Sequence, residues 1–175
     1  MAILQATTEL LYENGLDQLS IEAVAARAGV GKQTIYRWWP NRALLVADAL
    51  FDRDDIAPLP PADTGDAIAD LSRWAGDLAD ALGSERGAAT LRMLTAAAIE
   101  DPETSRRLHE KFSGALQEQG TARLAAAKDL RTTPTQRRHA VDAIIGFMVF
   151  RVHANQELTR KGATEVTKLV LGSLR

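Results

Sequence analysis

The sequence predicts an all-α fold of about nine helices, on the strength of three observations. Apolar residues recur three and four positions apart along most of the chain, the spacing that lines one face of a helix. No segment shows the strict alternation of apolar and polar residues that marks a half-buried strand. The six prolines and twelve glycines gather where the helical spacing is interrupted, so they separate helices rather than lie within them.

Composition limits the class of protein. The 175-residue chain is 46% hydrophobic and 25% charged, as soluble globular proteins are. It has no cysteine, which excludes disulfides, cysteine-ligated zinc and thiol nucleophiles. No apolar run approaches the ~20 residues that span a bilayer, and the first residues lack the pattern of a secretory signal, so a cytoplasmic location is expected. The net charge of −2 means that any nucleic-acid contact must come from a local basic face.

Four short helices are expected in the N-terminal part. The first starts near residue 3 and stops at Asn14-Gly15, where glycine allows a left-handed backbone. Ser20 is a suitable N-cap for the second helix, which ends at Gly29. The third is expected from Gly31 to about Trp39, and the fourth spans 41–52 after Pro40.

A proline-rich stretch over 54–65 is the one convincing linker. It divides the chain into a helix-turn-helix domain, 1–53, and a second helical domain, 54–175. Helices in the second domain are expected at 66–82, 85–100, 103–127, 135–160 and 163–174. The breaks among the last four are placed at Asp101-Pro102, Thr133-Pro134 and Lys161-Gly162.

The second and third helices form the pair that can carry function. Two short helices joined by a tight turn allow the second to lie in a DNA major groove while the first crosses the backbone. If Val30, Ile35 and Trp39 face inward, the opposite face carries Lys32, Gln33, Thr34, Tyr36, Arg37 and Trp38. These side chains suit contacts to base edges and phosphates. Residues 20–47 hold four basic residues and one acidic residue, a local balance of +3.

Residues 30–45 also carry a family resemblance. Their sequence, VGKQTIYRWWPNRALL, resembles the recognition-helix signature of the tetracycline-repressor (TetR) family, and the similarity extends over about residues 3–53. By this resemblance the chain is a DNA-binding transcriptional regulator, repression being the commoner mode, with a C-terminal effector and dimerisation domain. Tyr36 would hold a phosphate, Trp38 would lie against the DNA backbone, and Arg42 would replace the usual phosphate-binding lysine. Gly31 stands where a hydroxyl cap is common in the family.

The resemblance further implies a small-molecule effector in the second domain. The effector is expected to be mostly apolar with an anionic group, and the candidate lining residues are Trp74, Met93, Phe112, Met148 and Arg151. The alternative for each apolar residue is ordinary core packing, and for Arg151 a solvated or ion-paired surface. No cofactor and no metal is expected.

A homodimer through 135–160 and 163–174 is expected from the sequence itself. Residues 140–154 are apolar on two faces, one with Val141, Ile145, Val149 and Val152, the other with Ala143, Gly146, Phe147, Phe150 and Ala154. The final helix has a further stripe, namely Val166, Leu169, Val170 and Leu174. Two such helices from each subunit would complete a four-helix bundle. The alternative is a central helix buried entirely within its own subunit.

Two other functions remain as alternatives. An enzyme has little support, because the run from His109 to Ser113 begins like a zinc-protease helix but has serine where the second histidine is required. A helical adaptor that binds another protein through residues 20–39, without DNA, is the stronger rival.

Overall fold

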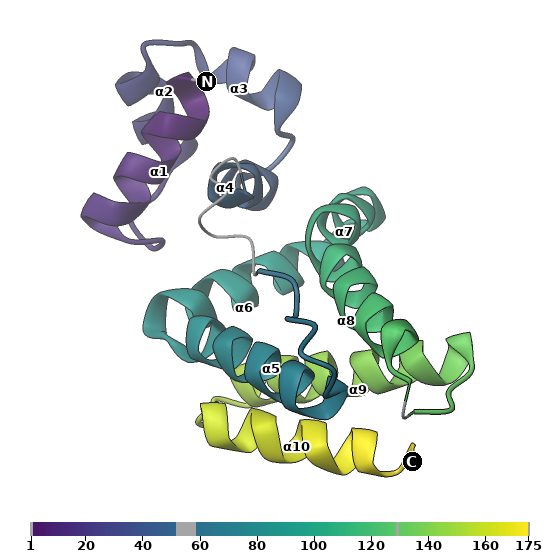
Figure 1. Cartoon of the computed structure of the whole chain (residues 1–175). Helices are drawn as coiled ribbons and strands as arrows, with labels where there is room; N and C mark the ends of the chain where they lie inside the picture. The colour runs from purple at the N-terminus through teal and green to yellow at the C-terminus, as the bar shows by residue number, and fades with distance from the viewer. Residues whose placement is uncertain (1, 52–58, 129, 175) are drawn as a thin grey trace. The chain divides into compact units, whose positions relative to one another are not determined.

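The computed structural model describes residues 2–51, 59–128 and 130–174, and in these ranges the chain forms helices and loops without a strand (Figure 1). The chain divides into two compact units. Unit 1 consists of Met1–Ala57 together with Arg92–Lys111, and unit 2 consists of Pro58–Leu91 together with Phe112–Arg175. The expected all-α fold is confirmed for the described residues.

Unit 1 is built on the four expected N-terminal helices. These are α1 (Ala2–Asn14), α2 (Ile21–Ala28), α3 (Lys32–Trp38) and α4 (Arg42–Phe51). Their apolar faces meet in one core that includes Leu10, Val24, Ile35, Leu45 and Val46. The end of α6 (Glu85–Glu100) and α7 (Pro102–Leu108) complete the unit, where Leu94 and Leu108 pack with Ala43, Leu44 and Ala47 of α4.

Unit 2 contains α5 (Ala67–Gly83), the start of α6, α8 (Gly114–Ala126), α9 (Pro134–His153) and α10 (Arg160–Gly172). α10 lies along α5, and α9 contacts α5, α8 and α10 (Figure 1). The core gathers the most buried apolar residues of these helices, among them Leu71, Trp74, Leu124, Ile144, Met148 and Leu171. One apolar stripe from each helix therefore supplies this core.

The segment expected as one helix over 103–127 is helical throughout, but it is not uniform. α7 is followed directly by a π-helical turn, η1 (His109–Ser113), and then by α8. A π turn adds one residue to a turn without ending the helix, and no proline or side-chain cap marks it here, so the sequence did not reveal it. Counted as one element, α7, η1 and α8 make nine helical segments in the described residues, as the sequence predicts.

The expected break at Lys161-Gly162 is wrong. α9 ends at His153 rather than near 160, because Asn155 takes a left-handed backbone (φ 50°) and the Gln156 N–H bonds back to Arg151 O. The next helix already begins at Arg160, where the N-cap Thr159 accepts a hydrogen bond from the Gly162 N–H. Gly162 thus lies in the first turn of α10.

The expected domain boundary near residue 54 lies outside the described residues, and from Leu59 to Asp66 the chain is non-helical. The sequence gives no indication that residues 92–111 associate with unit 1. Within the described residues no helix is both long and apolar enough to cross a membrane.

Candidate DNA interface

The turn between α2 and α3 follows from its capping residues. Ser20 Oγ accepts the Ala23 N–H at 3.1 Å, which starts α2. Gly29 ends it with φ 67°, and the Val30 N–H then bonds to Ala25 O at 3.0 Å. Only glycine adopts this left-handed conformation without a steric cost, so the turn is tight and α3 begins three residues later.

α3 is held to unit 1 by its inner face. Ile35 is fully buried, and Trp39, directly after the helix, packs against both apolar clusters of the unit. The Trp39 indole Nε1 donates a 2.8 Å hydrogen bond to Asp48 Oδ2 on α4. The inward orientation predicted for Ile35 and Trp39 is therefore confirmed, and the opposite face of α3 is turned outward.

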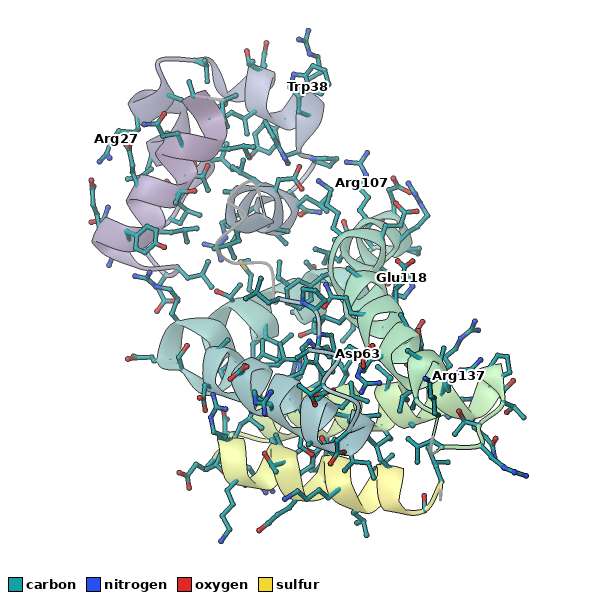
Figure 2. The ribbon with its side chains drawn as sticks, viewed as in Figure 1. Arg27, Trp38, Asp63, Arg107, Glu118 and Arg137 are labelled. Atoms are coloured by element: carbon teal, nitrogen blue, oxygen red, sulfur yellow. The ribbon has the colours of Figure 1, made fainter. Side chains whose placement is uncertain are left out.

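That outward face carries all six residues expected from the sequence. Lys32, Gln33, Thr34, Tyr36, Arg37 and Trp38 are all exposed. Trp38 is 61% exposed and Tyr36 48% exposed, which is unusual for large aromatic side chains in a folded domain. The Arg37 guanidinium lies 5.5 Å from the centre of the Trp38 ring, so a cation and an aromatic plane share one end of α3. Trp38 is labelled on α3 in Figure 2.

Two of the basic residues have partners that the sequence did not predict. Lys32 Nζ lies 3.0 Å from Glu22 Oε1 on α2, in an exposed ion pair. The hydrogen bond from Lys32 lowers the pKa of Glu22, which keeps the carboxylate ionised. Arg42 Nη1 donates to Leu19 O at 2.9 Å, just before the N-cap of α2, and Arg42 is only half-exposed. Arg42 thus has a structural bond to the main chain in addition to its expected role at DNA.

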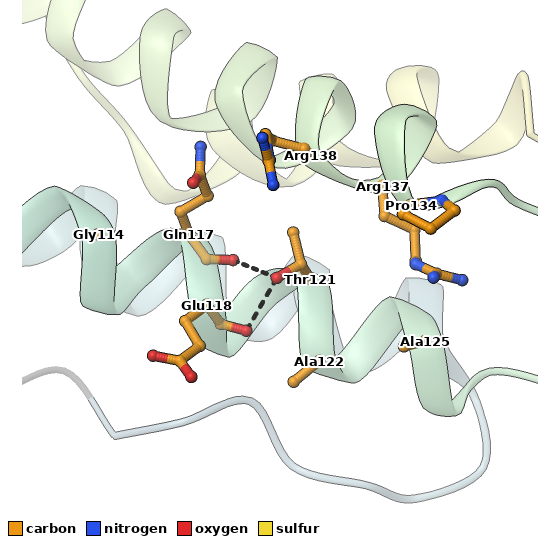
Figure 3. Close-up of a pocket in the computed structure, with 9 residues that line it drawn as sticks. All are labelled: Gly114, Gln117, Glu118, Thr121, Ala122, Ala125, Pro134, Arg137 and Arg138. Atoms are coloured by element: carbon orange, nitrogen blue, oxygen red, sulfur yellow. Dashed lines mark hydrogen bonds between the residues drawn. The ribbon is translucent and has the colours of Figure 1, made fainter.

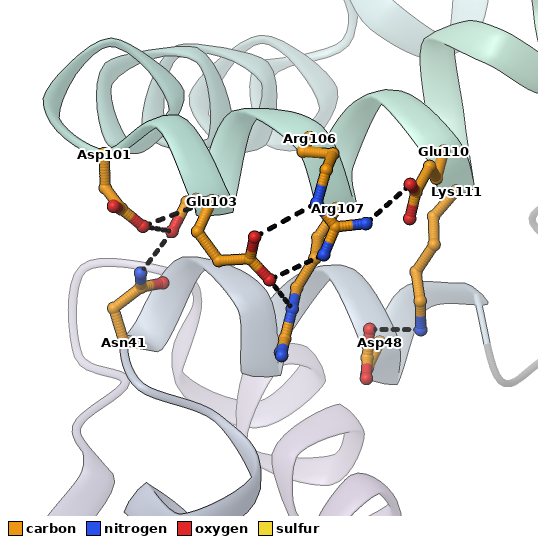
Figure 4. Close-up of polar contacts among 9 residues, drawn as sticks. Asn41, Asp48, Asp101, Glu103, Arg106, Arg107, Glu110 and Lys111 are labelled. Carbon is orange, nitrogen blue, oxygen red and sulfur yellow. Dashed lines mark hydrogen bonds and ion pairs between the residues drawn. The ribbon is translucent and has the colours of Figure 1, made fainter.

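The segment directly after α3 connects to α7. Asn41 caps α4 by accepting the Leu44 N–H at 3.0 Å, and its Nδ2 donates to Thr104 Oγ1 at 2.8 Å. Thr104 in turn donates to Asp101 Oδ2 at 2.6 Å (Figure 4). Further along α4, Asp48 Oδ1 lies 2.7 Å from Lys111 Nζ in an ion pair. The base of the recognition helix is therefore bonded to the part of the later chain that belongs to unit 1.

Three of the five residues expected to line an effector site lie in or against one apolar core, that of unit 2. Trp74 and Met148 are core residues of unit 2, and Phe112 is partly buried against that core. Arg151 donates to Glu157 O at 2.9 Å and lies over the Phe147 ring. Met93 packs in unit 1.

A groove of about 400 Å³ opens elsewhere on unit 2, between α8 and the start of α9 (Figure 3). Its floor is made of small residues of α8, and two arginines of α9 stand beside it. The lining residues are Gly114, Gln117, Glu118, Thr121, Ala122, Ala125, Pro134, Arg137 and Arg138. None of the five expected effector residues is among them.

Two family models match the chain, one over each of its two parts. Residues 61–170 match the family model "Tetracyclin repressor-like, C-terminal domain", and residues 3–49 match the model of bacterial regulatory proteins of the tetR family. The chain belongs to the TetR family. Over 101 residues it is 37% identical to the HTH-type transcriptional regulator YdeS of Bacillus subtilis, which covers 57% of this chain and 50% of YdeS. The DNA-binding transcriptional repressor TetR of Mycobacteroides abscessus is 38% identical over 77 residues, covering 44% of this chain and 40% of that protein.

Solved structures of TetR-family proteins share the fold over nearly the whole chain. The transcription regulator SCO0332 is 25% identical with a TM-score of 0.76, covering 99% of this chain and 97% of that one. Thermus thermophilus FadR, a repressor solved in complex with lauroyl-CoA, is 17% identical with a TM-score of 0.75. The match covers 99% of this chain and 94% of the FadR chain. The chain spans about half the length of the curated relatives it matches.

Proposed function

We propose that this TetR-family chain binds operator DNA in the cytoplasm through the outward face of α3, and represses transcription until a small-molecule effector lowers its affinity. The observation that carries the proposal is the exposure of six polar, basic and aromatic side chains on one short helix whose other face is locked into the unit 1 core. A groove-reading helix needs this combination of a rigid base and a chemically varied outer face.

Each outward residue has a role that follows from its chemistry. Gln33 can form a bidentate pair with an adenine edge, and Thr34 can contact a thymine methyl. Lys32 and Arg37 can reach guanine or phosphate, while Tyr36 and Trp38 each offer a polar hydrogen to the backbone. Arg42 keeps donors besides the Nη1 bond to Leu19, so it can stabilise α2 and meet a phosphate at once.

The homodimer is proposed on the outer faces of α9 and α10. α9 buries Val141, Ile144, Met148 and Val152 within its own unit, so it already has a core-facing stripe. Ala143, Gly146 and Phe150 on another face are exposed, Phe150 by 62%. On α10, Leu169 is 76% exposed, while Ala163, Thr167 and Leu171 face inward. These unused apolar residues support a second copy as the partner.

Two-fold symmetry of the dimer would set the spacing between its two recognition helices. Two recognition helices related by a dyad would read half-sites about 34–36 Å apart on one face of the duplex. An effector that changes their separation would then change DNA affinity. FadR, a repressor of similar fold, is solved with lauroyl-CoA, which joins an apolar acyl chain to an anionic group and so supports the expected class of effector for this chain.

The test is selection of bound fragments from genomic DNA, followed by gel shifts on the recovered sequences. Gln33→Ala should cost ~1–3 kcal/mol at one base position and little elsewhere. Tyr36→Phe should weaken binding to all sequences alike. Gln5→Ala, an exposed glutamine on α1, is the matched control and should change nothing. If the wild type selects no sequence and shifts no DNA, the protein-binding adaptor becomes the better account of this surface.

A further inference from the structure

The groove between α8 and the start of α9 is large enough to hold a small organic molecule. Its volume is about 400 Å³, within the range of ligand sites in proteins. On the α8 side it runs from Gly114 to Ala125, which at a rise of about 1.5 Å per residue gives about 16 Å of helix. All of its lining residues are exposed or half-exposed, so a ligand can enter without displacing the core of unit 2.

The dimensions of the groove favour a slender ligand. A volume of about 400 Å³ along about 16 Å of helix corresponds to a cross-section of roughly 25 Å². A helix with its side chains is about 10–12 Å across and could lie only over the mouth of the groove. An extended carbon chain or a flat ring fits within it. The α8 wall supports such an apolar body, because Thr121, Ala122 and Ala125 present methyl groups rather than long side chains (Figure 3).

The α9 side of the groove is positively charged. Arg137 and Arg138 project from α9 toward α8 (Figure 3). Arg137 Nη1 donates to Thr132 O at 3.1 Å, which steadies the side chain, and its other two nitrogens have no partner among the described residues. Arg138 is exposed and forms no hydrogen bond or ion pair within the described part of the chain. Both guanidinium groups therefore keep donors in the fork geometry that suits a carboxylate.

The surrounding charge decides how many anionic groups the ligand carries. Residues 128–139 contain four basic residues and one acidic residue, a local balance of +3 in a chain whose total is −2. Glu118 is the acidic residue of the lining, and its carboxylate points away from the two arginines (Figure 3). The nearby Asp142 accepts a hydrogen bond from Gln117, across the same pair of helices. One anionic group is thus attracted to the α9 side, whereas a second one on the α8 side would be repelled by Glu118.

We propose that this groove is the effector site of unit 2 and binds a slender organic monoanion, such as an aliphatic or aromatic carboxylate. The carboxylate pairs with Arg137 and Arg138, and the apolar body lies along Ala122 and Ala125. The proposal rests on the proposed effector function and gives that effector a site, in place of the residues expected from the sequence.

The wall formed by α8 gives the site a route to the DNA-binding helices. α8 continues through η1 into α7 without a break. On α7, Thr104 Oγ1 accepts a hydrogen bond from Asn41 at 2.8 Å, and Lys111 Nζ of η1 lies 2.7 Å from Asp48 Oδ1. A ligand that moves α8 against α9 would therefore act on the residues that hold the end of α3.

The experiment uses the full chain labelled with ¹⁵N and three probes that separate charge from apolar body. Octanoate has both, octanol has the body without the charge, and acetate has the charge without the body. Octanoate should shift the side-chain Nε–H resonances of Arg137 and Arg138, which are assigned by their loss in Arg137→Gln and Arg138→Gln. Octanol and acetate should each bind at least about tenfold more weakly, because each lacks one of the two kinds of contact.

Matched variants test whether the probe binds in the groove. Arg138→Gln should weaken octanoate about tenfold and leave octanol unchanged, whereas Arg131→Gln removes an exposed arginine outside the lining and should change neither. Ala122→Leu fills the groove and should abolish octanoate binding. Ala126→Leu adds the same side chain at an exposed position of α8 outside the lining and is its control. Alanine and leucine have similar helix propensities, so both leucine variants should fold as the wild type does.

Equal binding of octanoate and octanol, octanoate binding that survives Ala122→Leu, or arginine resonances that stay unmoved at the solubility limit of octanoate would each overturn the proposal. Gel shifts with selected operator DNA are run in parallel, and octanoate should lower the operator affinity of the wild type but not that of Ala122→Leu. Octanoate binding without a change in operator affinity overturns the assignment as the effector site. Operator binding without any octanoate response refutes the ligand proposal and leaves the proposed DNA function intact, whereas octanoate binding by a protein that shifts no DNA refutes that function instead.

Discussion

Burial separates two kinds of charged residue in this chain. Lys32 and Glu22 form a pair in which both side chains are more than half exposed, so water and salt screen their attraction and either partner is readily released. Arg123 and Asp70 are almost fully buried, so neither can lose its partner without leaving an uncompensated charge in the core. The first pair can therefore exchange partners in the proposed DNA complex, whereas the second is part of the fold.

Glu22→Gln should strengthen DNA binding. In the free protein the carboxylate holds Lys32, and DNA must displace it before the ammonium group reaches a phosphate or a base. An exposed pair is worth roughly 0.2–1 kcal/mol, so affinity should rise by up to about fivefold for every sequence. Fluorescence anisotropy at several salt concentrations measures this. Glu110→Gln, which removes a carboxylate paired to Arg106 on α7, is the control, and an equal gain in that variant would contradict the argument.

Asp70→Asn should destabilise the protein by about 3 kcal/mol, because Arg123 then loses its buried counter-charge. The effect has a defined pH dependence. The pKa of Asp70 is lowered from 3.8 to about 2, so its contribution is present above about pH 4 and is lost as the pH falls toward 2. Urea unfolding of wild type and variant at pH 7 and at pH 3 measures the difference, which should shrink at the lower pH. A difference that stays constant over this range would contradict the assignment.

At this scale the sequence predicted which face of α3 is exposed but not which atoms its charged residues contact. Helical spacing determines the face, and the buried Ile35 shows that the spacing was interpreted correctly. The partners of Lys32, Arg42 and Arg123 lie 10, 23 and 53 residues away along the chain. Such contacts depend on how helices pack, which local periodicity does not contain.

At the scale of elements, α4 joins the recognition helix to α7. Asn41 performs two tasks, since its Oδ1 caps α4 and its Nδ2 bonds to the buried Thr104 (Figure 4). Asp48 on the same helix bonds both Trp39 and Lys111. A displacement of α7 would therefore act on the residues that hold the end of α3.

Substitutions at Asn41 should separate the two tasks. Asn41→Ser keeps a good N-cap and loses the bond to Thr104, whereas Asn41→Ala loses both. The alanine variant should be less stable than the serine variant by about 1 kcal/mol, the usual value of an N-cap. Both should bind DNA more weakly than wild type if the Thr104 bond helps to hold α3. Chemical unfolding and operator affinity are measured on the same preparations, and equal stability of the two variants would exclude the capping role.

Helix ends were predictable wherever a capping residue or a proline marks them. Asp101-Pro102 and Thr133-Pro134 are the N-caps and first residues of α7 and α9, and Thr133 forms a capping box with Gln136. The end of α9 was missed because residues 154–161 include no glycine or proline, and the stop is made by Asn155. The π turn between α7 and α8 was missed because the chain stays helical through it and no proline or side-chain cap marks it.

At the scale of the whole molecule, chain order and compact units do not coincide. α6 passes from unit 2 into unit 1 at Leu91–Arg92, and the chain returns to unit 2 at Lys111–Phe112, inside the π turn. Composition marked the proline-rich linker but could not reveal this second connection, because a helix that crosses between units has no break in its pattern.

The proposed dimer places Gly146 at the centre of a face that its own subunit leaves open. A Cβ built on Gly146 meets no described atom within 4 Å, so a larger side chain fits the monomer without strain. Leucine is also more favourable than glycine in a helix interior, by up to about 1 kcal/mol, so Gly146→Leu should fold at least as well as wild type. In the dimer the same side chain would hold apart two helices that approach through Gly146 and Ala143.

Arg138→Leu adds leucine on the groove side of α9 and is the matched control. Light scattering should give twice 19.0 kDa for the wild type and the control, and 19.0 kDa for Gly146→Leu. Operator affinity should fall with the loss of the dimer, because one recognition helix then reads one half-site alone. A Gly146→Leu protein that remains dimeric would show that the two copies meet on another face.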